Sequence, residues 1–276
     1  LGTGYSPDME RWKLFTENIK APKNTVRIAI CGKYTSLKDS YASILEALTH
    51  AGAHNDAKVE VEMVETSDRD MMGMLNKRLK GFNGILVPGG FGDRGAEGKI
   101  SVVRYARENG VPFLGLCYGL QLAVVEYARN VCSISDANTT EIDNATKNPV
   151  ITYLPGQTDE TDKGGTMRLG SQTAKLKAGS VVHSLYSGTD EVYERHRHRY
   201  EVNPKYHEKL ESAGLVISGL SPDGRLAEFI ELPKEVHPYF IATQAHPEFT
   251  SRRERPDPLF NGFIKAAVDF SRSRDI

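Results

Sequence analysis

The stretch PFLGLCYGLQLAVVEYARN (residues 112–130) decides how the chain is expected to fold. It passes without a loop from a short apolar run, typical of a buried strand, into a helix-like pattern, and Cys117 lies at the junction. Glycines stand two positions before and two positions after this cysteine, which gives G-x-C-x-G, a cysteine form of the nucleophile elbow. The pattern predicts a sharp turn from strand to helix that lifts the thiol clear of a sheet.

Strand-like and helix-like segments alternate on both sides of this junction. Strands that alternate with helices through short connections predict an α/β fold, with a mostly parallel central sheet and helices on both faces. In such folds ligands bind at the carboxyl ends of the strands. The expected strands are 25–34, 59–65, 84–90, 111–117, 191–202, 225–232 and 239–246, and the expected helices are 38–51, 71–79, 96–108, one that follows Cys117, and 258–271.

Two regions depart from this regular pattern. Residues 1–24 show weak periodicity, and we expect a linker or capping segment there, followed by one domain over residues 25–276. Between residues 131 and 180 the periodicity fades into clusters of Asn, Thr, Asp and Gly, which are typical of turns. We interpret this region, and above all GQTDETDKGG (156–165), as a mobile surface loop.

The composition excludes several classes of protein. The chain has 276 residues, of which 39% are hydrophobic and 26% charged, as in ordinary globular domains. Its net charge of -1 gives no bulk attraction to nucleic acid or to anionic lipid, and no apolar run is long enough to span a membrane. Three cysteines without a C-x-x-C pair argue against a disulfide framework or a zinc ribbon. We therefore expect a cytoplasmic protein that binds neither nucleic acid nor membranes.

The three cysteines are not equivalent. A buried cysteine usually acts as a small hydrophobic residue, and we interpret Cys31 and Cys132 in this way. The helix that begins at Tyr118 would direct its N–H groups and positive dipole end at the Cys117 sulfur, which favours the thiolate. Taken alone, the pentapeptide around Cys117 is compatible with either a nucleophile or a packing residue.

The segment Gly90–Gly95 has the form G-x-G-x-x-G, which resembles a dinucleotide-binding motif. It follows the third expected strand rather than the first, and the next strand ends in Cys117 instead of an acidic residue for a ribose. We interpret the glycines differently. Gly89 and Gly90 would let a backbone N–H approach a substrate carbonyl and form an oxyanion hole with the N–H of Tyr118, although a plain glycine turn is the simpler alternative.

A thiolate nucleophile requires a base, and the base requires a group that orients it. The segment TQAHPEF (243–249) offers both, because His246 would emerge at the end of a strand and Glu248 could fold back toward its imidazole. Alone, this His-Pro-Glu would be read as a surface turn. Cys117, His246 and Glu248 at strand ends of one sheet together indicate acyl transfer.

Several segments resemble a known family. PGGFGDRG (88–95), FLGLCYGLQ (113–121) and AHPEF (245–249) resemble the signatures of class I glutamine amidotransferases, whose fold is flavodoxin-like with an added antiparallel part. RHRHRYEVN (195–203) and DANTTEI (136–142) resemble the glutaminase half of CTP synthases in particular. The resemblance implies that Cys117 attacks the side-chain amide of L-glutamine, that His246 transfers protons and that Glu248 holds His246. A thioester forms and is then hydrolysed.

The same resemblance implies a binding site for glutamine. Arg199 would bind the α-carboxylate and Glu141 the α-ammonium, since a free amino acid presents one charge of each sign. Period-two alternation would place Arg195, Arg197 and Arg199 on one face of their strand. A metal site at His196 and His198 is the alternative, but no third ligand lies nearby in the sequence, and we expect no metal. The further substrate-binding residues implied are Gly90, Tyr118, Gly119, Leu120 and Gln121.

CTP synthases also contain an amidoligase half, which uses ATP and magnesium to aminate UTP, and nothing resembling it is found in this chain. We therefore expect no cofactor here, an amidoligase half as the partner, and a homo-oligomer for the full-length protein. Two other functions remain open. One is a stand-alone cysteine hydrolase of the same fold, such as a γ-glutamyl hydrolase or a peptidase, and the other is a regulatory subunit without activity.

Overall fold

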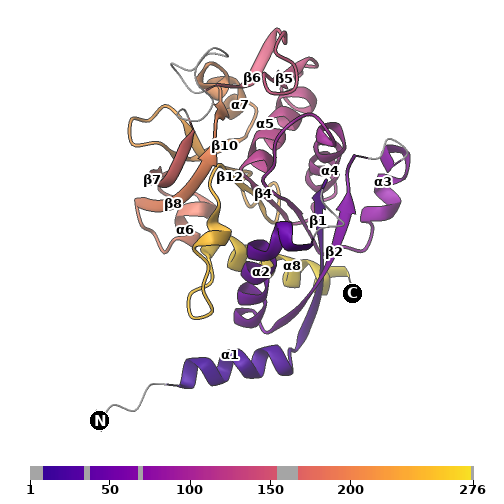
Figure 1. Cartoon of the computed structure of the whole chain (residues 1–276), viewed down its shortest axis with the longest axis vertical. Coiled ribbons are helices and arrows are strands. Elements are labelled where there is room, and N and C mark those ends of the chain that lie inside the picture. Colours follow the sequence, from indigo (N-terminus) through magenta and orange to yellow (C-terminus); the bar gives the residue numbers. More distant parts are fainter. Residues whose placement is uncertain (1–8, 34–37, 68–70, 154–166, 275–276) are drawn as a thin grey trace.

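The computed structural model describes residues 9–33, 38–67, 71–153 and 167–274. A nine-stranded sheet runs through the molecule in the order β2-β1-β3-β4-β12-β11-β10-β7-β8 (Figure 1). The pairs from β2 to β12 are parallel, and those from β12 to β8 are antiparallel. The strands of this sheet are β1 (Asn24–Gly32), β2 (Ala57–Glu65), β3 (Gly84–Val87), β4 (Phe113–Leu116), β7 (Arg168–Leu176), β8 (Glu191–His198), β10 (Val216–Leu220), β11 (Ala227–Glu231) and β12 (Phe240–Thr243).

Helices cover both faces of the parallel half, as the sequence predicts. On one face α2 and α8 pack over side chains such as Ile28 and Ile30 of β1, and on the other α3, α4 and α5 pack over Ala29 and Cys31. This alternation along β1 fixes the strand between two apolar layers. The helices are α1 (Glu10–Lys20), α2 (Ala42–His54), α3 (Met71–Leu79), α4 (Ala96–Glu108), α5 (Tyr118–Asn130), α6 (Val181–Leu185), α7 (His207–Ser212) and α8 (Pro258–Arg274), with 3-10 turns at η1 (Lys38–Tyr41), η2 (Pro204–Tyr206) and η3 (Pro247–Phe249).

The prediction of a loop over residues 131–180 is wrong. This region contains β7 and two strands of a second, three-stranded sheet, β5 (Ala137–Thr139) and β6 (Asn148–Tyr153). The longer strands β6 and β7 escape the pattern because few of their residues are buried, and because they pair with strands further along the chain: β6 with β9 (Tyr200–Val202), and β7 with β8. Strand β5 has only three residues. The segment 156–165 lies outside the described residues.

The single strand expected over residues 191–202 is in fact two. The chain leaves β8 at His198 and enters β9 at Tyr200, so that Arg199 lies between the large sheet and the small one. Alternation holds within β8, where Val192, Glu194, His196 and His198 are buried and the residues between them are exposed. Arg199 is half-buried at this junction, whereas Arg195 and Arg197 are exposed on β8.

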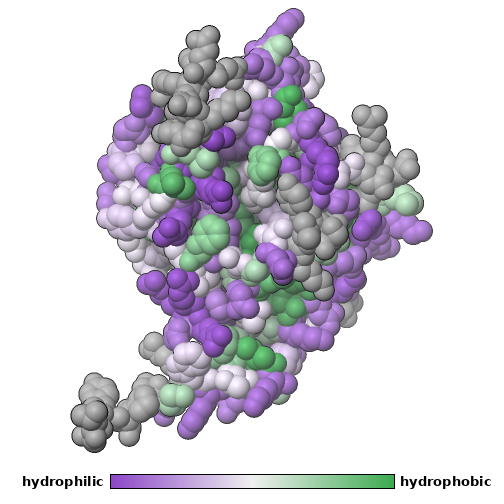
Figure 2. Space-filling view, viewed as in Figure 1, coloured by the Kyte–Doolittle hydropathy of each residue, from purple (hydrophilic) through white to green (hydrophobic). Residues whose placement is uncertain are grey.

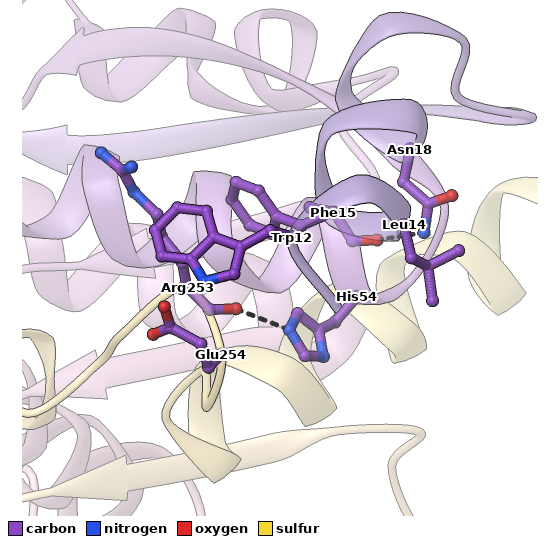
Figure 3. Close-up of a pocket in the computed structure, with 8 residues that line it drawn as sticks. Trp12, Leu14, Phe15, Asn18, His54, Arg253 and Glu254 are labelled. Carbon is purple, nitrogen blue, oxygen red and sulfur yellow. Dashed lines mark hydrogen bonds between the residues drawn. The ribbon is translucent and has the colours of Figure 1, made fainter. Parts of the chain in front are cut away.

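Helix α1 lies within the segment expected to be a linker or capping element, and it packs beside α2. The Asn18 side chain donates to the Ala53 carbonyl at 2.7 Å, and the rings of Phe15 and His50 lie 6.4 Å apart. A cavity of about 250 Å³ is lined by α1, the end of α2, Arg253 and Glu254, and the Arg253 guanidinium lies 5.6 Å from the centre of the Trp12 ring (Figure 3).

The surface is mixed in character. Hydrophilic residues spread over most of the face in Figure 2, and hydrophobic residues gather only in small groups. Among the described residues no helix is both long and apolar enough to cross a membrane.

Candidate active site

Cys117 occupies a sharp turn between β4 and α5, as the G-x-C-x-G pattern predicts. Its backbone φ of 50° and ψ of -101° lie in a region that non-glycine residues rarely adopt. The Cys117 N–H donates to the Thr243 carbonyl of β12 at 2.7 Å. The elbow is therefore a strained conformation held in place by the neighbouring strand.

The glycines on either side of Cys117 are required by packing. A Cβ atom built on Gly115 would lie 2.9 Å from the Ala242 Cβ, and one on Gly119 would lie 2.2 Å from the Val87 carbonyl oxygen. The latter is a backbone atom that cannot move aside easily. Larger residues at these positions would displace α5 from the sheet, and the sulfur would move with it.

His246 follows β12 and lies beside the elbow. Its Nδ1 is 2.8 Å from the Glu248 Oε1, and its backbone N–H donates to the Arg195 carbonyl of β8 at 2.8 Å. The ring packs so closely on Gly89 that a Cβ there would lie 2.8 Å from its Cε1. The three residues predicted to form a catalytic triad are thus brought together.

The electrostatics of His246 favour its charged form. Burial alone would lower its pKa, but hydrogen bonds to Cys117 and Glu248 outweigh this effect and raise the pKa to about 10. The imidazole therefore keeps its proton at neutral pH while it faces the sulfur.

A cavity of about 540 Å³ opens beside the elbow, and both Cys117 and His246 line it. Of the residues predicted to bind substrate, four also line it: Gly90, Gln121, Glu141 and Arg199. Three further lining residues are named from the sequence in other roles: Gly89 in the glycine turn, Arg197 in its strand and His198 in the alternative metal site. The sequence predicts no binding role for the remaining lining residues, which are Ser40, Tyr41, Phe91, Met167 and Tyr200.

Tyr118, Gly119 and Leu120, also predicted to bind substrate, form the first turn of α5 and are not among the residues that line the cavity. The Tyr118 ring is 1% exposed, and its hydroxyl donates to the Gly92 carbonyl at 2.7 Å. Any contact of this turn with a substrate would be made through backbone N–H groups at the helix start.

Glu141 lies in the connection between β5 and β6, and its side chain lines the cavity beside Cys117. Its Oε1 accepts a hydrogen bond from the Gly92 N–H at 2.8 Å. Burial raises the pKa of this carboxyl, while the Gly92 N–H and the positive charges of Lys33 and Arg199 oppose the increase. A cationic group bound in the cavity would relieve the cost of burying the carboxylate.

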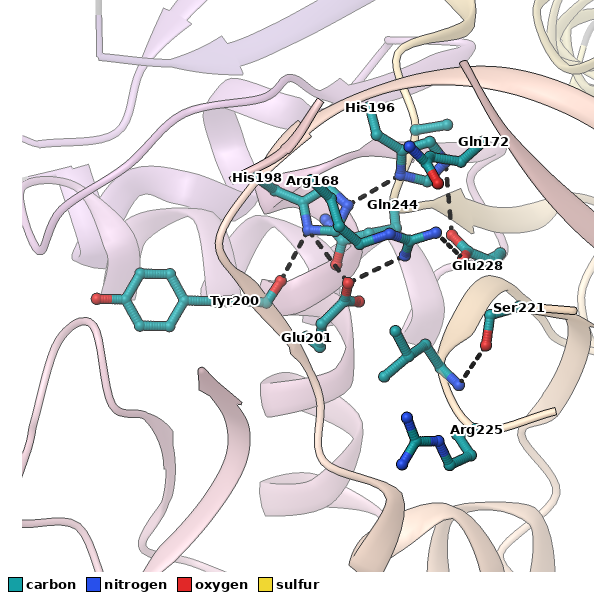
Figure 4. A network of polar contacts seen from close by, with 12 residues as sticks. Arg168, Gln172, His196, His198, Tyr200, Glu201, Ser221, Arg225, Glu228 and Gln244 are labelled. Atoms are coloured by element: carbon teal, nitrogen blue, oxygen red, sulfur yellow. Dashed lines mark hydrogen bonds and ion pairs between the residues drawn. The ribbon is translucent and has the colours of Figure 1, made fainter. Parts of the chain in front are cut away.

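The His-x-His pair belongs to a buried network next to the cavity (Figure 4). His196 Nδ1 and His198 Nε2 lie 2.9 Å apart, and Arg168 pairs with Glu201 at 3.0 Å and Glu228 at 2.6 Å. Burial lowers the pKa of His196 to about 2 and that of His198 to about 3, so both are neutral. In the described part of the chain no group of three or more His, Cys, Asp or Glu side chains could hold a metal ion.

The model of the family "Glutamine amidotransferase class-I" matches residues 36–266, and the chain belongs to this family. Within it, the chain groups with the glutaminase domains of CTP synthases. A solved structure of the glutaminase domain of Trypanosoma brucei CTPS with bound acivicin is 36% identical, with a TM-score of 0.82, and the match covers 88% of this chain and 94% of that one.

The sequences of CTP synthases are also similar to this chain. The CTP synthase of Methanocaldococcus jannaschii is 55% identical over 267 residues, and that of Methanococcus aeolicus is 53% identical over 269 residues. Each match covers 95% of this chain but only 49% of the other protein. The chain thus spans about half the length of these relatives.

Proposed function

We propose that the chain hydrolyses L-glutamine to glutamate and ammonia, with Cys117 as nucleophile, His246 as acid and base, and Glu248 as the group that orients His246. The observation that carries this proposal is the contact of a strained elbow cysteine with an imidazole whose Nδ1 lies 2.8 Å from a buried carboxylate.

In the first half of the reaction the Cys117 sulfur attacks the carbon of the glutamine side-chain amide. The C–N bond of the tetrahedral intermediate breaks as His246, held in its protonated form, gives its proton to the leaving nitrogen. Ammonia departs and a thioester remains. In the second half the neutral His246 takes a proton from water, the hydroxide attacks the thioester, and the C–S bond breaks to release glutamate.

The negative charge of the tetrahedral oxygen would be stabilised by the N–H groups of Gly90 and Tyr118. Among the described residues neither N–H has a hydrogen-bond acceptor, although Tyr118 begins a helix whose dipole favours an anion. Gly119 and Leu120 support this turn from within the fold, and Gln121 at its end lines the cavity.

Glu141 and Arg199 supply charges of opposite sign in the same cavity as the nucleophile. This arrangement suits the α-ammonium and α-carboxylate of a free amino acid. A γ-glutamyl hydrolase or a peptidase would have to accept a substrate in which one of these charges is blocked, and the site favours the free amino acid over such substrates.

The test of the nucleophile is the intact mass of the chain after treatment with a diazo-ketone analogue of glutamine. We expect one adduct, located on Cys117 by peptide mapping, and none in Cys117→Ala. Protection by L-glutamine but not by an N-acylated γ-glutamyl peptide, whose α-ammonium is blocked, would identify the substrate class. An adduct at another residue would contradict the proposal.

We further propose that the ammonia is used by an amidoligase half, which aminates UTP to CTP with ATP and magnesium as CTP synthases do. The support is that the chain spans about half of such enzymes. Adding a separately expressed amidoligase half with ATP and UTP should stimulate glutamate release by this chain and allow CTP to form. Formation of CTP by this chain alone would show that the proposed division of the two activities is wrong.

A further inference from the structure

Gln244 has no role in the mechanism above, yet it contacts the reacting atom. Its side chain is completely buried two residues before His246, and its amide nitrogen lies 3.6 Å from the Cys117 Sγ. Its backbone N–H donates to the Glu228 carbonyl at 2.9 Å, which anchors the residue to β11. Gln244 is labelled in Figure 4 together with the buried network that surrounds it.

The neighbouring hydrogen bonds decide which end of the Gln244 amide faces the sulfur. The Tyr200 carbonyl oxygen can only accept, so the group of Gln121 that lies 2.9 Å from it must be the NH₂. The same NH₂ lies 3.2 Å from the side chain of Gln244, which must therefore present its oxygen there. The NH₂ of Gln244 therefore points at Cys117. This orientation is fixed because the Tyr200 carbonyl, at the other end of the chain of hydrogen bonds, can only accept.

We propose that Gln244 is a second hydrogen-bond donor to the Cys117 sulfur and stabilises it as a thiolate. The inference rests on the proposed function, in which Cys117 is the nucleophile. A hydrogen bond to an ionised acceptor is roughly twice as strong as one to a neutral acceptor, so this donor favours the thiolate over the thiol. Gln244 thus lowers the energy of the sulfur both before it attacks and when it leaves the thioester.

Gln244 differs from His246 in that it cannot give up its proton. When His246 has passed its proton to the leaving ammonia, the imidazole is neutral, and the amide of Gln244 continues to donate to the sulfur. It also restricts where the sulfur can lie, because the amide is itself fixed by Gln121 and by the backbone of β11.

The ionisation of the sulfur also depends on the charged and titratable groups around it. His246 faces it directly, and Glu248 acts through His246. The other such groups that share the cavity or influence His246 are Tyr41, Glu141, His196, Arg197, His198, Arg199 and Tyr200. None of these changes in the variants below, so their contribution is common to parent and variant.

The experiment measures the rate at which iodoacetamide alkylates Cys117 as a function of pH, and the glutaminase kcat/KM of the same proteins. Gln244→Met removes the donor and keeps a similar volume. We expect the pH midpoint of alkylation to rise by about one unit and kcat/KM to fall about tenfold. Gln244→Glu places a carboxylate beside the sulfur and should raise the midpoint further. Gln172→Met is the control, because that amide donates to the Leu169 carbonyl instead.

A folded Gln244→Met variant with the parent midpoint and the parent kcat/KM would overturn the inference. If that variant does not fold, an unchanged midpoint in Gln244→Glu, which keeps the shape of the side chain, would do the same. Failure of the proposed function has a different signature: glutaminase activity would survive alkylation of Cys117 in the parent, or would persist in Cys117→Ala.

Discussion

The two halves of the nine-stranded sheet contribute to the site in different ways. In the parallel half, Cys117 is positioned by a single turn between β4 and α5, within a few residues of chain. In the antiparallel half, Arg199 is positioned by the passage of the chain from one sheet to another, which depends on pairings with distant strands. The comparison suggests that local geometry places the group that reacts, and tertiary pairing places the groups that recognise the substrate.

His246 lies where these two halves meet. It follows β12, which pairs in parallel with β4 and antiparallel with β11, and its backbone is hydrogen-bonded to Arg195 of β8. Removing the imidazole tests the role of the groups that react. We expect His246→Ala to lower glutamine turnover by roughly 10³- to 10⁴-fold. Glu248→Ala should lower it less, because that carboxylate only orients the ring.

Glutamate release at saturating glutamine measures this effect, with His54→Ala on the exposed side of α2 as the control. Turnover close to the parent value in His246→Ala would show that another group transfers the proton.

The next largest effect should come from the buried network that holds the antiparallel half together. Arg168 pairs with Glu201 and Glu228, whose side chains are each only 1% exposed. Arg168→Ala leaves two buried carboxylates without their cation, and we expect a loss of about 3–5 kcal/mol in the free energy of unfolding. Urea unfolding followed by circular dichroism measures this.

The matched control is Arg225→Ala, since Arg225 pairs with Asp223 at 2.8 Å on the surface, where both side chains are at least half exposed. It should cost at most about 1 kcal/mol. Similar losses for the two arginines would mean that the buried network contributes no more than a surface pair.

The same division explains what the sequence could predict. The elbow, the His246–Glu248 pair and the helices over the parallel half depend on residues close together in the chain, such as the glycines around Cys117, and these features appear in the structure. Cys117 and His246 lie far apart in the chain and are brought together by the parallel pairing of β4 with β12. The pairings of β6 with β9 and of β7 with β8, on which the break at Arg199 depends, join segments that are separated along the chain, so local periodicity gave no sign of them. The role of Gln244 could not be predicted from strand alternation, because Gln244 and His246 both lie beyond the end of β12 at Thr243.

Substitution of Arg199 tests the role of the groups that recognise the substrate. If its guanidinium binds the α-carboxylate of glutamine, Arg199→Ala should raise KM by roughly 10- to 100-fold, as expected for a charge-assisted hydrogen bond worth about 1.5–3 kcal/mol, with a smaller change in kcat. Lysine should restore binding only in part, because it lacks the planar fork of arginine.

The exposed Arg195 on the same segment provides the control. Steady-state kinetics of the two alanine variants distinguish the possibilities. An unchanged KM in Arg199→Ala together with a raised KM in Arg197→Ala would move the carboxylate site to Arg197, which also lines the cavity.

The smallest expected effect is the part of the pH dependence of stability that His196 and His198 of the antiparallel half contribute. Burial keeps His196 and His198 neutral in the folded protein, with pKa values of about 2 and about 3, against an ordinary value of 6.5 in the unfolded chain. As the pH falls from 6.5 toward 3, the unfolded chain binds two protons that the folded protein does not. Stability is therefore lost on acidification, by up to about 1.4 kcal/mol per pH unit for each histidine.

His196→Gln removes one of these groups while keeping a side chain that can both donate and accept. We expect the slope of the unfolding free energy between pH 6 and pH 5 to decrease by about 1 kcal/mol per pH unit relative to the parent, as measured by urea unfolding at each pH. Carboxylates contribute equally to both proteins, and His54→Gln, which alters an exposed imidazole on α2, should leave the slope at the parent value. An unchanged slope in His196→Gln would mean that His196 binds a proton in the folded protein as readily as in the unfolded chain. The two histidines of the antiparallel half would then not be a neutral pair.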